Sequence, residues 1–215
     1  MDMHVFDLLS IIGTIAFAMS GAFVAMEEEY DILGVLVLGL VTAFGGGMIR
    51  NVLIGVPVTT IWEQGDLILL AIVSVFVAFV LPMPWIKHWK RTEAFFDAIG
   101  LSAFAVQGGI YAAQMNHPLI AVIVAAALTG IGGGVIRDLL AGRKPLVLRD
   151  EIYAVWAMAA GAAVGLGIAA TTWQLLALFV TVVLFRMLSV HYKWRLPRRS
   201  LGDSSSINPE NKISL

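Results

Sequence analysis

The stretches TAFGGGMIRN (residues 42–51) and TGIGGGVIRD (residues 129–138) share a triple glycine followed by an arginine, and each lies inside a long apolar run. A glycine destabilises a helix interior by roughly 1 kcal/mol relative to alanine. An arginine near the centre of a bilayer costs roughly 2.5 kcal/mol or more. Residues this unfavourable to an apolar helix indicate a functional site, and their duplication indicates an internal repeat.

The overall composition is typical of a membrane protein. Of the 215 residues, 59% are hydrophobic and 13% are charged, and the mean hydropathy is +0.87. So few charged residues cannot form the charged surface that a water-soluble protein of this length needs. The net charge of −1, without basic patches interleaved with aromatic residues, argues against nucleic acid as a partner. The sequence has no cysteine, and no nucleophile motif or histidine spacing predicts an enzyme, a cofactor or a resident metal.

Seven runs approach the length of about 20 apolar residues that a membrane-spanning helix needs. They cover residues 5–26, 32–53, 66–86, 96–115, 118–141, 150–170 and 173–192. Lysine and arginine gather in the segments that end or follow the third, fifth and seventh runs, at residues 87–91, 143–149 and 186–199. The loops after the second, fourth and sixth runs carry neither residue. By the positive-inside rule, this alternation predicts an amino terminus outside the cell and a carboxyl terminus in the cytoplasm.

The internal repeat extends well beyond the glycine phrases. An offset of 87 aligns residues 10–55 with 97–142 without a gap, and 17 of these 46 positions are identical. Because each repeat holds three predicted spans, an odd number, the second repeat is expected to lie upside down relative to the first. The predicted fold is therefore an all-α integral membrane protein with seven transmembrane helices, built as two inverted three-helix repeats and a C-terminal seventh helix. The first three-helix repeat is predicted to cover residues 1–92 and the second, inverted repeat residues 93–171. The seventh helix is predicted at 172–196 and a disordered cytoplasmic tail at 197–215.

The triple glycines are interpreted as breaks in two opposed helices. Three glycines in one turn allow a helix to kink or unwind, and the freed carbonyl oxygens can coordinate a monovalent cation near the membrane midplane. The alternative is that the glycines only let two helices pack closely. The two threonines of the phrase either line the path or bond to their own helix, and both interpretations stay open. The candidate pore residues are Gly45, Gly46, Gly47, Gly132, Gly133, Gly134, Thr42, Thr129, Arg50 and Arg137.

Both arginines need partners in an apolar environment. The predicted topology places Asp7 on the same membrane side as Arg50, and Asp97 on the same side as Arg137, so we expect each aspartate to pair with its arginine. The alternative is that each arginine extends to the lipid headgroups. Asp138 has the neutral Asn51 as its counterpart, and it is expected to join a network with Arg143 or Lys144.

With its paired glycine–arginine phrases at 45–51 and 132–138, its two three-helix repeats and its seventh helix, the chain resembles the bacterial UPF0126 membrane proteins, relatives of the TRIC trimeric intracellular cation channels. The resemblance implies a prokaryotic cell membrane and a homotrimer with one pore in each subunit. It also implies that the second and fifth helices line this pore, kink at the glycines and pass K⁺. The Lys-Glu-Val phrase of the animal channels is absent from this sequence, so regulation through it is not expected.

Three functions remain open at this stage. The first is a passive channel for monovalent cations in the lipid bilayer. The second is a transporter of glycine or a similar small amino acid, a label that the bacterial family also carries. The third is a scaffold that transports nothing, which leaves the duplicated glycine phrase without a purpose.

Overall fold

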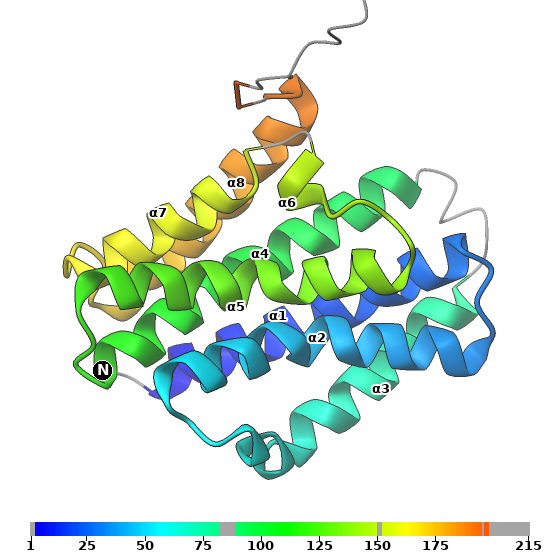
Figure 1. Cartoon of the computed structure of the whole chain (residues 1–215), viewed down its shortest axis with the longest axis horizontal. Helices are drawn as coiled ribbons and strands as arrows, with labels where there is room; N and C mark the ends of the chain where they lie inside the picture. The colour runs from blue at the N-terminus through cyan, green and yellow to red at the C-terminus, as the bar shows by residue number, and fades with distance from the viewer. Residues whose placement is uncertain (1–2, 82–88, 150–151, 195, 198–215) are drawn as a thin grey trace, which may run out of the picture.

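The computed structural model is all-helical and describes residues 3–81, 89–149, 152–194 and 196–197 (Figure 1). Five of its helices are long and apolar enough to cross a membrane: α1 (Met3–Glu27), α2 (Ile32–Ile54), α4 (Trp89–Gln114), α5 (Leu119–Leu140) and α8 (Thr172–Tyr192). Two shorter apolar helices are α3 (Gly65–Val80) and α7 (Ala154–Gly165). The one-turn α6 (Leu146–Arg149) and the 3₁₀ helix η1 (Val58–Glu63) connect longer elements.

Each of the seven predicted spans contains a helix, but two of these helices are shorter than predicted. α3 ends at Val80, and residues 82–88 of the third predicted span and its loop lie outside the described part. α7 ends at Gly165, because Gly167 adopts a left-handed φ of 72° and turns the chain toward α8. The predicted tail lies outside the described residues from 198 onward.

The ends of the long helices follow from local sequence. The side chain of Asp31 accepts a hydrogen bond of 2.8 Å from the amide of Gly34, which caps the start of α2. α2 ends before Gly55, whose φ of 76° suits glycine far better than other residues. The equivalent Gly142 follows α5 with a φ of 69°. The two repeats therefore end their second helices in the same way.

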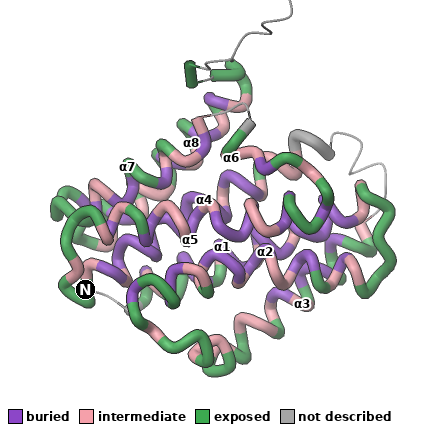
Figure 2. Tube along the Cα trace, in the orientation of Figure 1, coloured by how far each residue is buried: buried purple, intermediate pink, exposed green. Residues whose placement is uncertain are grey.

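Four helices form the centre of the molecule. α1, α2, α4 and α5 lie side by side along its long axis, and α3 lies beside α1 and α2 (Figure 1). α7 packs on α4 and α5, and α8 packs on α4 and α7. Buried residues concentrate on this central group, whereas α3 and α8 present more exposed surface (Figure 2). The central four helices therefore hold most of the core.

Contacts between α1 and α4 are reciprocal. A Cβ built on Gly13 would press on the ring of Phe104, and one built on Gly100 would press on the ring of Phe17. The two phenylalanine rings also touch, with centroids 5.3 Å apart. Gly13 and Gly100 are 87 positions apart, as are Phe17 and Phe104. Such an exchange of equivalent contacts is what a two-fold relation between two units produces, and it requires that α1 and α4 run antiparallel.

Candidate functional site

The triple glycines lie where α2 and α5 cross. The α-helix continues without interruption through Gly45–Gly47 and through Gly132–Gly134, so the expected unwound breaks with free carbonyls are wrong. The physical reason is that backbone amides and carbonyls at membrane depth need partners, and an unbroken helix provides them. Close packing is present at this crossing, and the expected kinks and the pore-lining role of these glycines stay predictions.

The helices approach each other through backbone atoms. A Cβ on Gly132 would lie 2.9 Å from the Cα of Gly46, and a Cβ on Gly46 would collide with the carbonyl oxygen of Thr129. Reciprocally, a Cβ on Gly133 would collide with the carbonyl oxygen of Thr42. These positions must be glycine because there is no room for even a methyl group between the two helices.

The glycines of one phrase are not equivalent in their surroundings. A Cβ on Gly45 would lie 2.7 Å from the end of the Ile136 side chain, which can move, and a Cβ on Gly47 would meet only the guanidinium of Arg50 at 3.8 Å. A small side chain would therefore fit at Gly47 but not at Gly46.

Both threonines of the phrases bond to their own helices. The hydroxyl of Thr42 donates to the carbonyl of Leu38, and that of Thr129 donates to the carbonyl of Ala125, each at 2.6 Å. Thr129 also borders a cavity described below. Both hydroxyls thus bond to their own helices, and a role of either threonine in lining a path stays a prediction.

Arg137 lies in a fully buried polar cluster. Its Nη1 is 2.8 Å from Oδ1 of Asp97, which is the expected ion pair, and it also donates to Oγ of Ser20 at 2.6 Å. Its Nη2 lies 2.8 Å from Oδ1 of Asp138. Two carboxylates therefore surround a guanidinium that has no exposure to solvent, as a buried charge requires. The alternative, extension to headgroups, does not describe Arg137.

Asp138 belongs to this cluster and not to the expected network with Arg143 or Lys144. Its Oδ2 accepts a hydrogen bond of 2.9 Å from the amide of Leu146 at the start of α6, while its Oδ1 serves Arg137. Both carboxylate oxygens are thus engaged by nearer donors. Lys144 and Arg143 lie close by on the wall of the same cavity.

Arg50 is held quite differently from Arg137. Its Nε and Nη2 donate to Oδ1 of Asn51 at 3.1 and 2.8 Å, and its guanidinium lies 4.5 Å from the centre of the Tyr111 ring. The expected ion pair between Arg50 and Asp7 is not formed between these two described residues, because Asn51 and Tyr111 take up the guanidinium and the side chain of Asp7 is exposed. A cation–π contact of this kind contributes about 0.5–2 kcal/mol.

A cavity of about 490 Å³ borders Arg50, and we call it the Arg50 cavity. It lies between the first half of α1, the last part of α2, η1 and the last half of α4. Its polar wall includes Asp7, Ser10, Asn51, Thr60, Glu63, Gln107 and Thr129. It therefore contains two carboxylates and one guanidinium.

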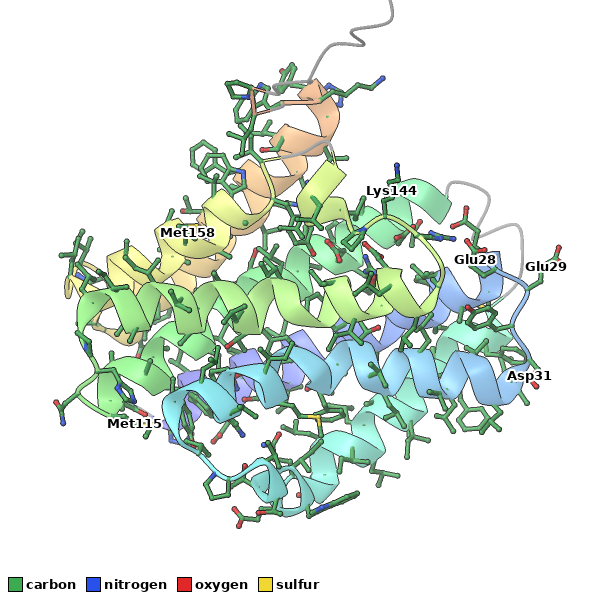
Figure 3. The ribbon with its side chains drawn as sticks, in the orientation of Figure 1. Glu28, Glu29, Asp31, Met115, Lys144 and Met158 are labelled. Carbon is green, nitrogen blue, oxygen red and sulfur yellow. The ribbon has the colours of Figure 1, made fainter. Side chains whose placement is uncertain are left out.

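A second cavity of about 450 Å³ lies at the end of the molecule where α5 ends, and we call it the Arg143 cavity. Its charged wall consists of Glu27, Glu28, Glu93, Asp138, Arg143, Lys144 and Arg186. Glu28 and Lys144 mark this end in Figure 3, with Met115 at the opposite end. α2 and α5 run antiparallel (Figure 1). The Arg50 cavity borders the end of α2 and the Arg143 cavity borders the end of α5, so the two cavities lie toward opposite ends of this helix pair.

Arg143 connects helices around its cavity. It donates to Oε1 of Glu28 at 2.6 Å and to Oε2 of Glu27, and its Nη1 lies 4.0 Å from Oε2 of Glu93. Burial lowers the pKa of Arg143, but the hydrogen bonds with Glu28 and Glu27 outweigh this, and the net pKa is raised above its usual value. Arg143 thus joins the end of α1 to the beginning of α4.

Sequence reasoning missed several residues of these clusters. They are Ser10, Ser20, Gln107, Tyr111, Tyr153, Glu63, Glu93 and Arg186. The 87-residue offset contains a signal for three of them, because it relates Ser10 to Asp97 and Ser20 to Gln107. Nothing local in the sequence indicates that Arg186 lies 4.6 Å from the ring of Tyr153 and 4.0 Å from Oδ2 of Asp97.

Comparison with known proteins supports both the repeat and the family. A family model described as "Glycine transporter" matches residues 7–83 and again residues 94–170. The two matches are displaced by 87 positions, the offset of the internal repeat. The UPF0126 membrane protein YvgT of Bacillus subtilis is 60% identical over 194 residues, which cover 90% of this chain and 96% of YvgT. This chain belongs to the UPF0126 family.

Other relatives of this UPF0126 protein support the same family assignment. A UPF0126 membrane protein of Deinococcus radiodurans is 39% identical over 91% of this chain and 92% of its own length. Among solved structures, a prokaryotic TRIC channel crystallised in 0.5 M KCl is 36% identical with a TM-score of 0.80, covering 91% of this chain and all of that one. The TRIC orthologue from Rhodobacter sphaeroides is 34% identical with a TM-score of 0.76, covering 88% of this chain and 99% of that one. The protein is therefore a multi-pass membrane protein homologous to TRIC cation channels.

Proposed function

We propose that this protein is a channel for monovalent cations, including K⁺, and that α2 and α5 line the pore of each subunit. The observation that carries this proposal is the pair of polar cavities at opposite ends of the α2–α5 crossing. Carboxylates border both cavities, among them Asp7 and Glu63 in one and Glu93 in the other. Carboxylates at the mouths of a narrow passage raise the local concentration of cations.

In this proposal, the backbone contact between Gly46 and Gly132 closes the path between the two cavities. Opening requires that α2 and α5 move apart or slide at this contact, and the lack of side chains on these glycines allows such a movement with little steric resistance. Because both helices keep their hydrogen bonds, water and polar side chains solvate the passing ion in this proposal, and unwound carbonyls do not.

The proposal includes an arrangement in the membrane. We infer seven spans, with α3 and α7 completing the five long helices, and two three-helix repeats of opposite orientation. The reciprocal contacts between α1 and α4 support the inverted repeat. The basic residues Arg143 and Lys144 favour a cytoplasmic Arg143 cavity and an amino terminus outside. The relative from Rhodobacter sphaeroides is a trimeric cation channel, which favours a homotrimer with one pore in each subunit.

Flux through reconstituted liposomes tests this function. We expect vesicles loaded with KCl to release K⁺ once an ionophore lets a counter-ion move and balance the charge. Vesicles loaded instead with N-methylglucamine chloride should release none of this larger cation. The name of the matching family makes a glycine transporter the second candidate. Saturable uptake of labelled glycine without K⁺ release would support that candidate against the channel. Absence of both activities in correctly folded protein would contradict both and leave a scaffold.

A further inference from the structure

The two arginine clusters are built from equivalent positions with different chemistry. The four correspondences, each of 87 residues, are Arg50 with Arg137, Asn51 with Asp138, Ser10 with Asp97, and Gln107 with Ser20. Around Arg137, two of these positions are carboxylates that contact the guanidinium. Around Arg50, the same two positions are an amide and a hydroxyl. The first repeat therefore keeps the buried arginine and replaces both of its anionic partners by neutral groups.

The neutral groups do not compensate the charge of Arg50. Asn51 accepts from the guanidinium through Oδ1 and donates to Oγ1 of Thr60 at 3.2 Å. Gln107 donates to Oγ of Ser10, and the Ser10 hydroxyl donates to the carbonyl of Phe6. Among the described residues, no carboxylate forms an ion pair with Arg50. Its guanidinium is oriented by Asn51 and Tyr111 but keeps its full positive charge.

Arg50 and Arg137 also differ in access. Arg137 has no exposed surface, whereas Arg50 is 7% exposed and borders the Arg50 cavity. A buried guanidinium is stabilised best by a carboxylate, whose two oxygens match its fork of N–H groups. In the second repeat the chain supplies that carboxylate. In the first repeat, the cavity is where a carboxylate from outside the chain can approach.

We propose that Arg50 binds the carboxylate of a small solute that enters the Arg50 cavity. Asp7 and Glu63 border the same cavity and would repel a plain anion, but they favour a solute that also carries an ammonium group. The ligand class is thus a small monocarboxylate, with zwitterions preferred. This inference deepens the second candidate function, the transport of a small amino acid, and it holds whether or not the protein conducts K⁺.

Ligand-dependent thermal unfolding of the purified full chain in detergent tests this site, in a buffer low in chloride. The probes are acetate, glycine and glycinamide, which lacks the carboxylate. We expect acetate and glycine to raise the unfolding temperature, glycine at lower concentration, and glycinamide to leave it unchanged. Asp7→Asn together with Glu63→Gln should weaken the response to glycine several-fold and preserve the response to acetate.

The internal repeat supplies the decisive variant, Asn51→Asp. It gives Arg50 the carboxylate that Arg137 has at the equivalent position. The Thr60 hydroxyl, which accepts from Asn51 and donates to the carbonyl of Pro57, has only to rotate to donate to this carboxylate. We expect this variant to fold and to lose the response to both acetate and glycine, as Arg50→Gln should if it folds. A response that persists in Asn51→Asp would overturn the proposal. So would an equal response to glycine and glycinamide, or an equal response to chloride and acetate. If the protein conducts no K⁺ but acetate and glycine still raise its unfolding temperature as expected, only the channel function is contradicted.

Discussion

Gly46 of α2 and Gly132 of α5 face each other with no room for a side chain, since a Cβ on Gly132 would lie 2.9 Å from the Cα of Gly46. Within a bilayer, hydrophobic burial does not drive helices together, and such close backbone contact provides the packing instead. In the channel proposed above, the same contact closes the path between the two polar cavities. Substitutions at this point therefore affect both the stability of the fold and the proposed path.

The first prediction compares two glycines of one phrase. Gly46→Ala should lower the free energy of unfolding by about 1–3 kcal/mol, because its Cβ meets the backbone of α5, including the amide of Gly133 at 3.1 Å. Gly47→Ala should be neutral, or stabilise by up to about 1 kcal/mol, because only Arg50 lies within reach. Thermal unfolding in detergent measures both. If both variants lose the same free energy of unfolding, the helix crossing does not exclude a side chain at Gly46 in particular.

The second prediction concerns the buried ion pair. Asp97→Asn leaves the guanidinium of Arg137 with less negative charge in a site closed to solvent, and should destabilise the protein by about 3–5 kcal/mol. Asp7→Asn is the matched control, because Asp7 is exposed at an early position of α1 and should change stability by less than about 0.5 kcal/mol. The yield of folded protein and its unfolding temperature report the difference. If Asp97→Asn unfolds at the temperature of Asp7→Asn, the pair contributes nothing.

The third prediction concerns Arg143, one of the cationic side chains on the wall of the Arg143 cavity. Arg143→Gln removes a positive charge close to Glu27, Glu28 and Glu93. A charge about 10 Å from a passing ion in a wet cavity raises its energy by about 1 kcal/mol, so K⁺ flux should increase by about fivefold. Stability should fall by less than about 1 kcal/mol, because the ion pairs of Arg143 are partly exposed.

Ionic strength provides the control for Arg143→Gln. Salt at 1 M reduces the screening length to about 3 Å, so the flux of the variant and of the unchanged protein should converge. A difference in flux that persists at high salt would show that the substitution changes the shape of the cavity and not its charge.

The fourth prediction separates the two equivalent threonines. Thr129→Val should reduce K⁺ flux by about fivefold, the effect of about 1 kcal/mol for one lost polar contact, because Thr129 borders the Arg50 cavity. Thr42→Val loses the same bond to its own helix and is not on that wall, so its flux should remain close to that of the unchanged protein. Equal flux in the two variants would exclude Thr129 from the path.

Several features could be predicted from the sequence because they depend on local or repeated chemistry. Apolar runs predict helices, since only an internally hydrogen-bonded backbone is stable in lipid. The 87-residue offset, which the matching family model reproduces, predicts that the two halves of the chain correspond. The pairing of Asp97 with Arg137 was also predictable, because topology places both at the same end and a buried charge requires a partner.

The tertiary structure decided the roles of the glycines and of Arg50. A triple glycine is compatible with a break or with close packing, and the choice depends on what faces it: here Gly46 meets the backbone of α5. Arg50 contacts Tyr111, 61 positions away on another helix, and not Asp7. Sequence alone determined where helices form, because helical hydrogen bonds join residues four positions apart. Only the fold decided which side chains meet, because those contacts depend on how separate helices cross.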